Sequence, residues 1–175
     1  MADTTRPIKR GGLRLLAAAA LVLLTALVLS PGQAAAKYAS LVIDADTGEV
    51  LHSVNADTRN YPASLTKMMT LYKIFEAVES RRWSMNTRLR MSVRAAGQPP
   101  SKLGLKPGET ISVRDAILAL SVKSANDIAA AVAENYSGKE WQFAREMTAT
   151  AHRLGMDRTT FRNASGLPHS AQLST

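Results

Sequence analysis

The spacing of apolar residues along the chain predicts a β-hairpin followed by a series of helices. Apolar and polar residues alternate in YASLVID (38–44) and EVLHSV (49–54), and the ADTG between them contains the turn residues Asp46 and Gly48. Farther along, the apolar spacing becomes that of helices separated by Gly and Pro. The predicted elements are a hairpin over 38–54, helices over 61–80, 113–121, 125–135 and 141–154, a short strand over 88–93 and a C-terminal loop.

Two of these helices show additional local signals. Ser112 followed by Asp115 is typical of a helix start, because the serine hydroxyl can accept a hydrogen bond from a free N–H of the first turn. The last helix is predicted to end at Gly155. Its apolar face is predicted to consist of Trp141, Ala144, Met147, Ala151 and Leu154.

The helix predicted over residues 61–80 has two polar residues on its apolar side. The predicted buried stripe contains Ser64, Lys67, Met68, Leu71, Ile74, Phe75 and Val78. Burial lowers the pKa of a lysine amine, and a neutral Lys67 one turn after Ser64 could remove the serine proton. Ser64 is then a candidate nucleophile. In the ordinary alternative, Ser64 caps the helix and Lys67 extends its amine to water.

A second polar cluster follows at Ser124-Ala-Asn126. The pattern S-x-N also occurs at Ser53 and Ser84, but only Ser124 lies in a tight link between two apolar helices. We predict that this cluster is internal, with Ser124 relaying a proton and Asn126 positioning Lys67 and the substrate. Alternatively, Ser124 is the N-cap of the next helix.

The first 36 residues are predicted to be an export signal. Basic residues precede an apolar run over 15–29, and Ala34 to Ala36 supply small residues for cleavage. The run of about fifteen residues is shorter than the roughly twenty that a spanning helix needs. We therefore predict export to the periplasm or cell envelope and a mature domain over 37–175. An uncleaved anchor is the alternative, and this segment would then be the protein's contact with the membrane.

Composition and the remaining motifs argue against several classes of protein. The formal net charge is +8, but the basic residues are scattered and lack interleaved aromatic residues, so nucleic-acid binding is not predicted. The three histidines have no metal-ligand spacing, and neither a metal nor a cofactor is predicted. The chain lacks cysteine, which excludes a disulfide framework. It also lacks G-x-S-x-G, which argues against an α/β-hydrolase.

Taken together, these residues resemble the low-molecular-weight penicillin-binding proteins that are serine-type D-alanyl-D-alanine carboxypeptidases. The resemblance spans about residues 38–168. It includes S-x-x-K at Ser64, S-x-N about sixty residues later, and the stretch LGMDRTTFRNASGLP over 154–168. It implies an α+β fold of the β-lactamase/transpeptidase type, with a helical cluster beside an antiparallel sheet.

The resemblance also implies roles for the candidate residues. Ser64 would be the acyl-enzyme nucleophile and Lys67 its base, with Ser124 and Asn126 as the second motif. The implied substrate is the D-Ala-D-Ala end of a peptidoglycan stem peptide, and β-lactams would acylate the same serine.

The chain departs from the family pattern in its last part. The third family motif, K-T-G, does not occur in these 175 residues, and the continuation after S-G-L-P is altered to HSAQLST. In the family, the part of the chain that carries K-T-G also supplies most of the sheet, the subsite for the substrate carboxylate and one N–H of the oxyanion hole. We therefore expect residues 37–175 to be an incomplete peptidase domain that is inactive by itself.

Two other readings of the same motifs are open. One is a non-catalytic remnant that binds cell-wall peptide. The other, less favoured, is a class A β-lactamase, which shares S-x-x-K. Here S-A-N replaces the S-D-N of those enzymes, and no E-x-x-L-N-like glutamate follows.

Overall fold

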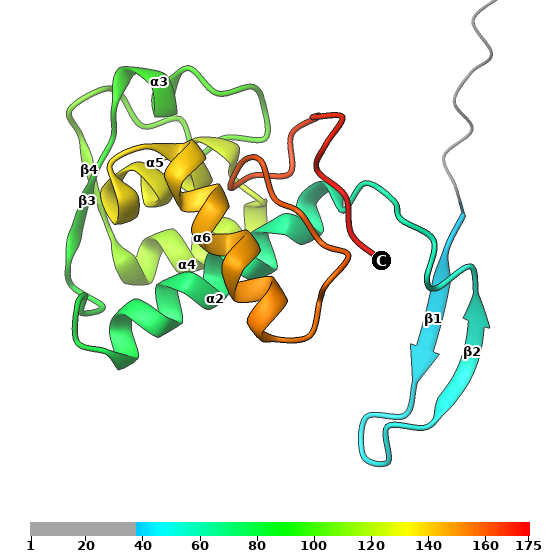
Figure 1. Ribbon diagram of the computed structural model, residues 1–175. Helices are drawn as coiled ribbons and strands as arrows, with labels where there is room; N and C mark the ends of the chain where they lie inside the picture. The colour runs from blue at the N-terminus through cyan, green and yellow to red at the C-terminus, as the bar shows by residue number, and fades with distance from the viewer. Residues whose placement is uncertain (1–37) are drawn as a thin grey trace, which may run out of the picture. The chain divides into compact units, whose positions relative to one another are not determined.

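The computed structural model describes residues 38–175, and the export signal predicted over 1–36 lies outside them. Helices and two short antiparallel strand pairs make up the described chain, which confirms the predicted α+β class. In Figure 1, α2, α4, α5 and α6 gather into one helical body. The elements are β1 (Ser40–Ile43), β2 (Val50–Val54), η1 (Ala63–Leu65), α2 (Thr66–Glu79), β3 (Arg88–Arg90), α3 (Val93–Ala96), β4 (Thr110–Ser112), α4 (Val113–Lys123), α5 (Asn126–Ser137) and α6 (Glu140–Arg153).

The predicted hairpin is confirmed. Strand β1 pairs antiparallel with β2, with Val42 opposite His52. The carboxylate of Asp44 organises the turn, because its Oδ1 accepts hydrogen bonds from the N–H groups of Asp46 at 3.0 Å and Thr47 at 2.7 Å. Such a local side-chain contact replaces the backbone hydrogen bonds that a tight turn leaves unmade.

Helix α5 forms the centre of the helical body and contacts α2, α3, α4 and α6. Residues 128–133, IAAAVA, are fully buried all round the helix. Four of these six side chains are alanine methyl groups, which allow neighbouring backbones to approach closely. No helix within residues 38–175 is long and apolar enough to cross a membrane.

The predicted start of α4 is confirmed. Ser112 is the N-cap residue, and its hydroxyl accepts a hydrogen bond from the Asp115 N–H at 3.1 Å. Just before this cap, β4 pairs with β3 and places Leu89 opposite Ile111. Both of these side chains are buried, so the small sheet contributes to the core beside α5.

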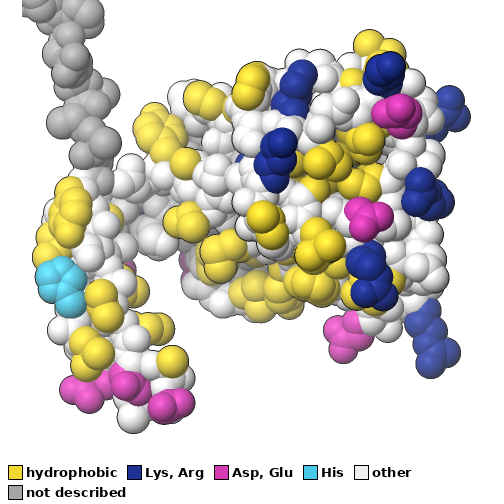
Figure 2. Space-filling model, turned by 180° about the vertical axis from the view of Figure 1, so that it is seen from behind, with side chains coloured by type: hydrophobic (Ala, Val, Ile, Leu, Met, Phe, Trp, Pro, Cys, Tyr) yellow, Lys and Arg dark blue, Asp and Glu magenta, His cyan; other side chains and the backbone are white. Residues whose placement is uncertain are grey.

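The predicted buried face of α2 is partly wrong. Met68 and Phe75 are 67% and 49% exposed, whereas Lys67, Thr70 and Lys73 are buried. Lys73 can be buried because its amine pairs with Glu76 and also contacts the Thr150 hydroxyl. The inner face of α2 therefore mixes buried polar side chains with Met69, Ile74 and Ala77, while Met68 and Phe75 remain exposed. Figure 2 shows many apolar side chains on the surface of the helical body.

The face predicted for α6 needs a similar correction. Ala144, Met147 and Ala151 are buried as predicted, but Trp141 and Leu154 are 53% and 51% exposed. Phe143, which the predicted stripe omitted, is fully buried. Its ring contacts Tyr136 of α5 edge to face, with centroids 5.2 Å apart. Aromatic packing between helices therefore rotates the buried face away from Trp141.

Candidate active site

Ser64 lies in the 3₁₀ turn η1, immediately before α2, rather than in one continuous α-helix. Its side chain is exposed, so the prediction of a buried serine is wrong. No side chain caps the start of η1 or of α2, and the alternative role of Ser64 as a helix cap is also wrong. The hydroxyl is therefore available to a molecule that arrives from solvent.

Lys67 is buried, as the sequence predicts for a candidate base. Its side chain does not extend to water, since the residue is only 3% exposed. The Nζ donates hydrogen bonds to Asn126 Oδ1 at 2.9 Å and to the Ser165 carbonyl at 2.6 Å. Among the described residues, no ion pair involves Lys67. Burial without a counter-charge lowers the pKa of this amine.

Asn126 connects Lys67 to the loop between α3 and β4. It is the first residue of α5 and is 7% exposed. Its Nδ2 donates to the carbonyls of Pro99 and Pro100, both at 3.1 Å. The structure therefore brings Lys67 and Asn126 together, as predicted from the two motifs.

Ser124 does not cap α5, so that alternative is wrong. Ser124 is instead the C-cap residue of α4, and its backbone adopts the left-handed conformation with a φ of 53°. The N-cap residue of α5 is Ala125. The Ser124 hydroxyl is buried and has no hydrogen-bond partner in the described part of the chain. An unpaired buried hydroxyl costs about 1–3 kcal/mol, and Thr66 Oγ1 of α2 is unpaired in the same way.

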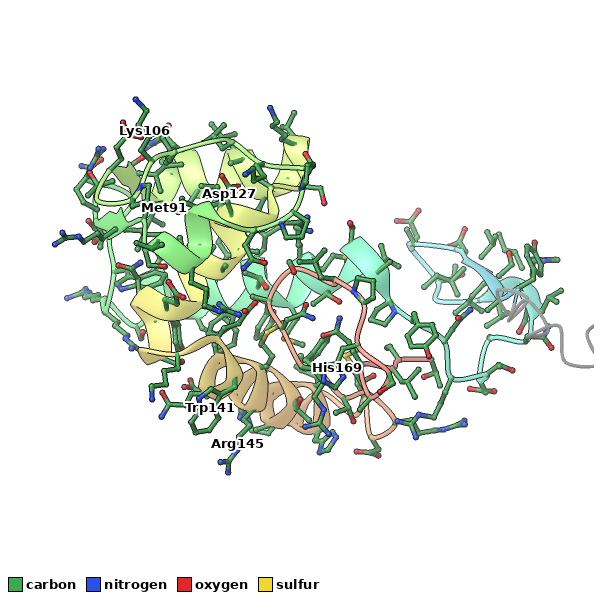
Figure 3. The ribbon with its side chains drawn as sticks, turned by 90° about the horizontal axis from the view of Figure 1, so that it is seen from above. Met91, Lys106, Asp127, Trp141, Arg145 and His169 are labelled. Atoms are coloured by element: carbon green, nitrogen blue, oxygen red, sulfur yellow. The ribbon has the colours of Figure 1, made fainter. Side chains whose placement is uncertain are left out.

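The buried carboxylate of Asp127, labelled in Figure 3, binds the same loop that contains Pro99 and Pro100. Asp127 is fully buried and accepts hydrogen bonds from the N–H groups of Leu103 at 3.0 Å and Gly104 at 2.8 Å. These two hydrogen bonds hold the loop between α3 and β4 against the start of α5. The loop in turn supplies the carbonyls that orient Asn126.

A segment near the C-terminal end of the described chain completes the surroundings of Lys67. We call residues 162–167 the strap. Besides the Ser165 carbonyl, the strap presents the Ala164 carbonyl, which accepts a hydrogen bond from Thr70 Oγ1 at 2.7 Å. The Ala164 N–H donates to Glu140 Oε1 at 2.9 Å. Sequence reasoning missed these contacts, since backbone groups carry no residue-specific signal.

Gly166 brings the strap into direct contact with the backbone at Ser64. A Cβ on Gly166 would lie 1.7 Å from the Ala63 carbonyl oxygen and 3.1 Å from the Ser64 nitrogen. Gly166 also has a φ of 86°, which side chains disfavour. The S-G-L-P stretch could have indicated this glycine, although not what it touches.

The altered continuation HSAQLST supports the strap. Gln172 is buried, and its Oε1 accepts hydrogen bonds from the N–H groups of Arg162 at 2.9 Å and Asn163 at 3.0 Å. The Asn163 Oδ1 accepts the Gly166 N–H at 2.7 Å. These contacts attach the strap to the C-terminal segment and fix the turn at Gly166.

The structure unites only part of the predicted site by hydrogen bonds. Within the described residues, Lys67 is joined to Asn126, but no hydrogen bond joins Lys67 to Ser64 or Ser124. Catalytic hydrogen bonds are often longer in a protein without substrate and tighten when substrate binds. Within residues 38–175, no cluster of His, Asp and Glu could hold a metal ion.

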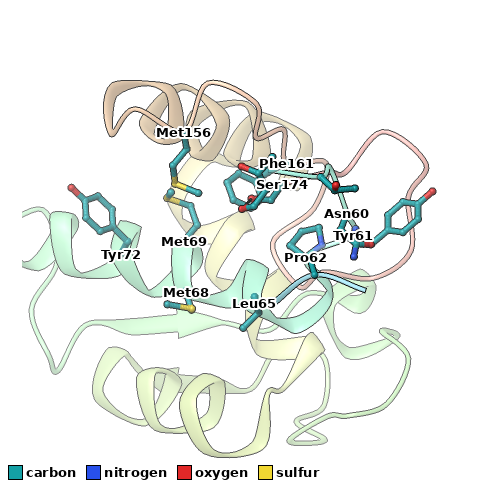
Figure 4. Close-up of a pocket in the computed structure, with 13 residues that line it drawn as sticks. Asn60, Tyr61, Pro62, Leu65, Met68, Met69, Tyr72, Met156, Phe161 and Ser174 are labelled. Atoms are coloured by element: carbon teal, nitrogen blue, oxygen red, sulfur yellow. Dashed lines mark hydrogen bonds between the residues drawn. The ribbon is translucent and has the colours of Figure 1, made fainter. Parts of the chain in front are cut away.

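Two cavities border the turn η1 that contains Ser64. One, of about 390 Å³, lies between residues 61–63 and residues 166–172. The other, of about 520 Å³, opens along the exposed side of α2 and is lined mainly by apolar side chains (Figure 4). Leu65, Met68 and Tyr72 line this second cavity, whereas Ser64 and Lys67 do not.

Comparison with known proteins gives a consistent result. The family model described as D-alanyl-D-alanine carboxypeptidase matches residues 26–175. D-alanyl-D-alanine carboxypeptidase DacF of Bacillus subtilis (strain 168) is 36% identical over 136 residues, which are 78% of this chain and 35% of the relative. The chain thus spans about a third of the length of this curated relative.

Solved structures show the same likeness. The D-alanyl-D-alanine carboxypeptidase DacD of Francisella tularensis matches with a TM-score of 0.76 and 36% identity, over 78% of this chain and 33% of that one. Penicillin-binding protein D2 of Listeria monocytogenes in its ampicillin-bound form matches with a TM-score of 0.63 and 34% identity, over 78% and 55%. The chain therefore belongs to the family of D-alanyl-D-alanine carboxypeptidases.

Proposed function

We propose that the protein is a serine-type D-Ala-D-Ala carboxypeptidase that acts on peptidoglycan stem peptides through an acyl-enzyme at Ser64. The observation that carries this proposal is the buried Lys67, one turn after an exposed serine and bonded to two uncharged acceptors. A lysine with a lowered pKa can act as the base that activates a serine hydroxyl.

In the proposed reaction, Ser64 Oγ attacks the carbonyl carbon of the penultimate D-Ala, and its proton passes to the Lys67 amine. The bond to the terminal D-Ala nitrogen then breaks, and that nitrogen takes up a proton relayed through the Ser124 hydroxyl. An ester on Ser64 remains. Water hydrolyses this ester, which releases the shortened peptide and restores the serine hydroxyl.

The second motif has distinct parts in this scheme. The unpaired buried hydroxyl of Ser124 is free to accept and donate a proton. The side chain of Asn126 is held by two backbone carbonyls, so its Oδ1 stays directed at Lys67. A fixed Asn126 positions the amine and supports placement of the substrate beside it.

The relatives support the class of ligand. Penicillin-binding protein D2 of Listeria monocytogenes has been solved in ampicillin-bound and cefotaxime-bound forms. We propose that β-lactams likewise acylate Ser64 here. We also propose that the protein is exported to the periplasm or cell envelope, where its substrate occurs, through the signal predicted over residues 1–36.

The experiment uses the protein at the length that its gene encodes. Labelling by a fluorescent penicillin and release of D-alanine from diacetyl-L-Lys-D-Ala-D-Ala are measured for the wild type and for Ser64→Ala. Ser121→Ala is the matched control, because Ser121 is an exposed serine that bonds only within α4. We expect Ser64→Ala to lose both activities and Ser121→Ala to keep them.

Two results would contradict the proposal. Labelling of Ser64→Ala at the wild-type rate would show that another residue is the nucleophile. Labelling of the wild type without release of D-alanine would favour a binding protein over an enzyme.

A further inference from the structure

The number of hydrogen bonds that the Lys67 amine can donate depends on its protonation state. A neutral amine has two N–H bonds and one lone pair, whereas an ammonium has three N–H bonds and no acceptor. Lys67 donates to Asn126 Oδ1 and to the Ser165 carbonyl. In the neutral state both N–H bonds are therefore used, and the lone pair occupies the remaining tetrahedral direction. The two acceptors thus determine where the base is able to take a proton.

One of these acceptors is held by the second motif. Asn126 Nδ2 lies against the carbonyls of Pro99 and Pro100, which only a donor can bind. Rotation of the amide by half a turn would place its oxygen against these two carbonyl oxygens. The Oδ1 therefore has to face Lys67.

The other acceptor depends on Thr70. This threonine lies one turn after Lys67 on the same face of α2 and is fully buried. Its hydroxyl binds the Ala164 carbonyl, the neighbour of the Ser165 carbonyl that Lys67 binds. Two successive carbonyls of the strap are thereby attached to two successive turns of α2.

We propose that Thr70 is a positioning residue for the reaction at Ser64. It holds the Ala164–Ser165 peptide in place, so that the Ser165 carbonyl and Asn126 together direct the Lys67 lone pair toward Ser64. This inference rests on the proposed function and adds to it a residue that touches neither the substrate nor the nucleophile. The Glu140 carboxylate accepts the Ala164 N–H and so holds the preceding Asn163–Ala164 peptide.

The chain offers a closely matched control for Thr70. Thr66 is a threonine of the same helix and is also fully buried, but its hydroxyl has no hydrogen-bond partner among the described residues. Thr66→Val and Thr70→Val thus make the same chemical change at equal burial. They differ in whether a hydrogen bond to the strap is lost.

The experiment measures acylation of the full-length protein by a fluorescent penicillin over a range of penicillin concentrations. This range separates the limiting acylation rate from the affinity of the preceding complex. We expect Thr70→Val to lower the limiting rate about tenfold with little change in affinity, because a misdirected base slows the chemical step. Thr70→Ser keeps the hydroxyl and should restore the rate to within about threefold of wild type. Thr66→Val should react as the wild type does.

Thermal unfolding of each variant separates positioning from folding. If Thr70→Val does not fold, Thr70→Ala removes the same hydroxyl with less bulk and is compared with Thr66→Ala. A folded Thr70 variant that acylates at the wild-type rate, or a Thr66 variant that slows equally, overturns the inference while the proposed function stands. A wild-type protein that is never labelled overturns both.

Discussion

Replacement of Gly166 by alanine tests the contact between the strap and the turn η1. The added Cβ would lie 1.7 Å from the Ala63 carbonyl oxygen and 2.4 Å from the Ala63 carbonyl carbon. Both distances are far below normal van der Waals separations, and the atoms met are backbone atoms that cannot rotate away. The strap or η1 must therefore move by more than about 1 Å.

The expected cost has two parts. An alanine in a left-handed conformation is destabilised by about 1–2 kcal/mol relative to glycine. Overpacking of a tight site adds about 1–3 kcal/mol to the loss in free energy of unfolding. Since a displacement of about 1 Å near reacting groups lowers rates by roughly a hundredfold, acylation of Ser64 should fall by a similar factor.

Gly155→Ala is the matched control. Gly155 has a φ of 81°, close to the 86° of Gly166, but a Cβ there meets no atom within 4 Å. Denaturant unfolding and penicillin acylation are measured for both variants. We expect Gly166→Ala to be less stable than Gly155→Ala by about 2 kcal/mol and much slower to acylate. Equal stability and equal acylation of the two variants would refute this account of the strap.

Three further outcomes are expected. The acylation rate should rise with pH and level off below the ordinary lysine pKa of about 10.4, because burial lowers the pKa of Lys67 and only its neutral amine is a base. Lys67→Arg should nearly abolish labelling at every pH tested, since arginine stays protonated. Ser124→Ala should slow acylation while Ser53→Ala, in the exposed S-x-N of β2, should not, and equal rates for the two variants would exclude a proton relay through Ser124. Intact-mass measurement of the exported protein should show Lys37 as its first residue, whereas a mass that includes residues 1–36 would indicate an uncleaved anchor.

Several features were predictable because local interactions produce them. The hairpin turn depends on Asp44 and its own neighbours, and the start of α4 depends on Ser112 and a residue three positions later. The spacing of Ser64 and Lys67 puts them one turn apart in any helical segment. The apolar spacing was likewise sufficient to predict a helix over residues 125–135, which the structure has as α5.

The orientation of each helix was decided by the tertiary structure. Apolar spacing alone placed Met68 and Phe75 of α2 inside, yet this helix buries Thr70 and Lys73. Thr70 binds the distant Ala164 carbonyl, and Lys73 pairs with Glu76 and also contacts the distant Thr150 hydroxyl. A periodic pattern records which residues are apolar. It does not record which polar residues will find partners.

The surroundings of the candidate base were the least predictable part of the chain. The Ser165 carbonyl that binds Lys67 is 98 residues away in sequence, and every residue has such a carbonyl. Similarly, nothing near Ser124 indicates its left-handed backbone or its unpaired hydroxyl. The sequence by itself determined the nucleophile, the base and the second motif as candidates, since these depend on side-chain chemistry at short spacing. Only tertiary packing decided which backbone groups hold the base, because backbone groups are chemically alike and become distinct only by their position in the fold.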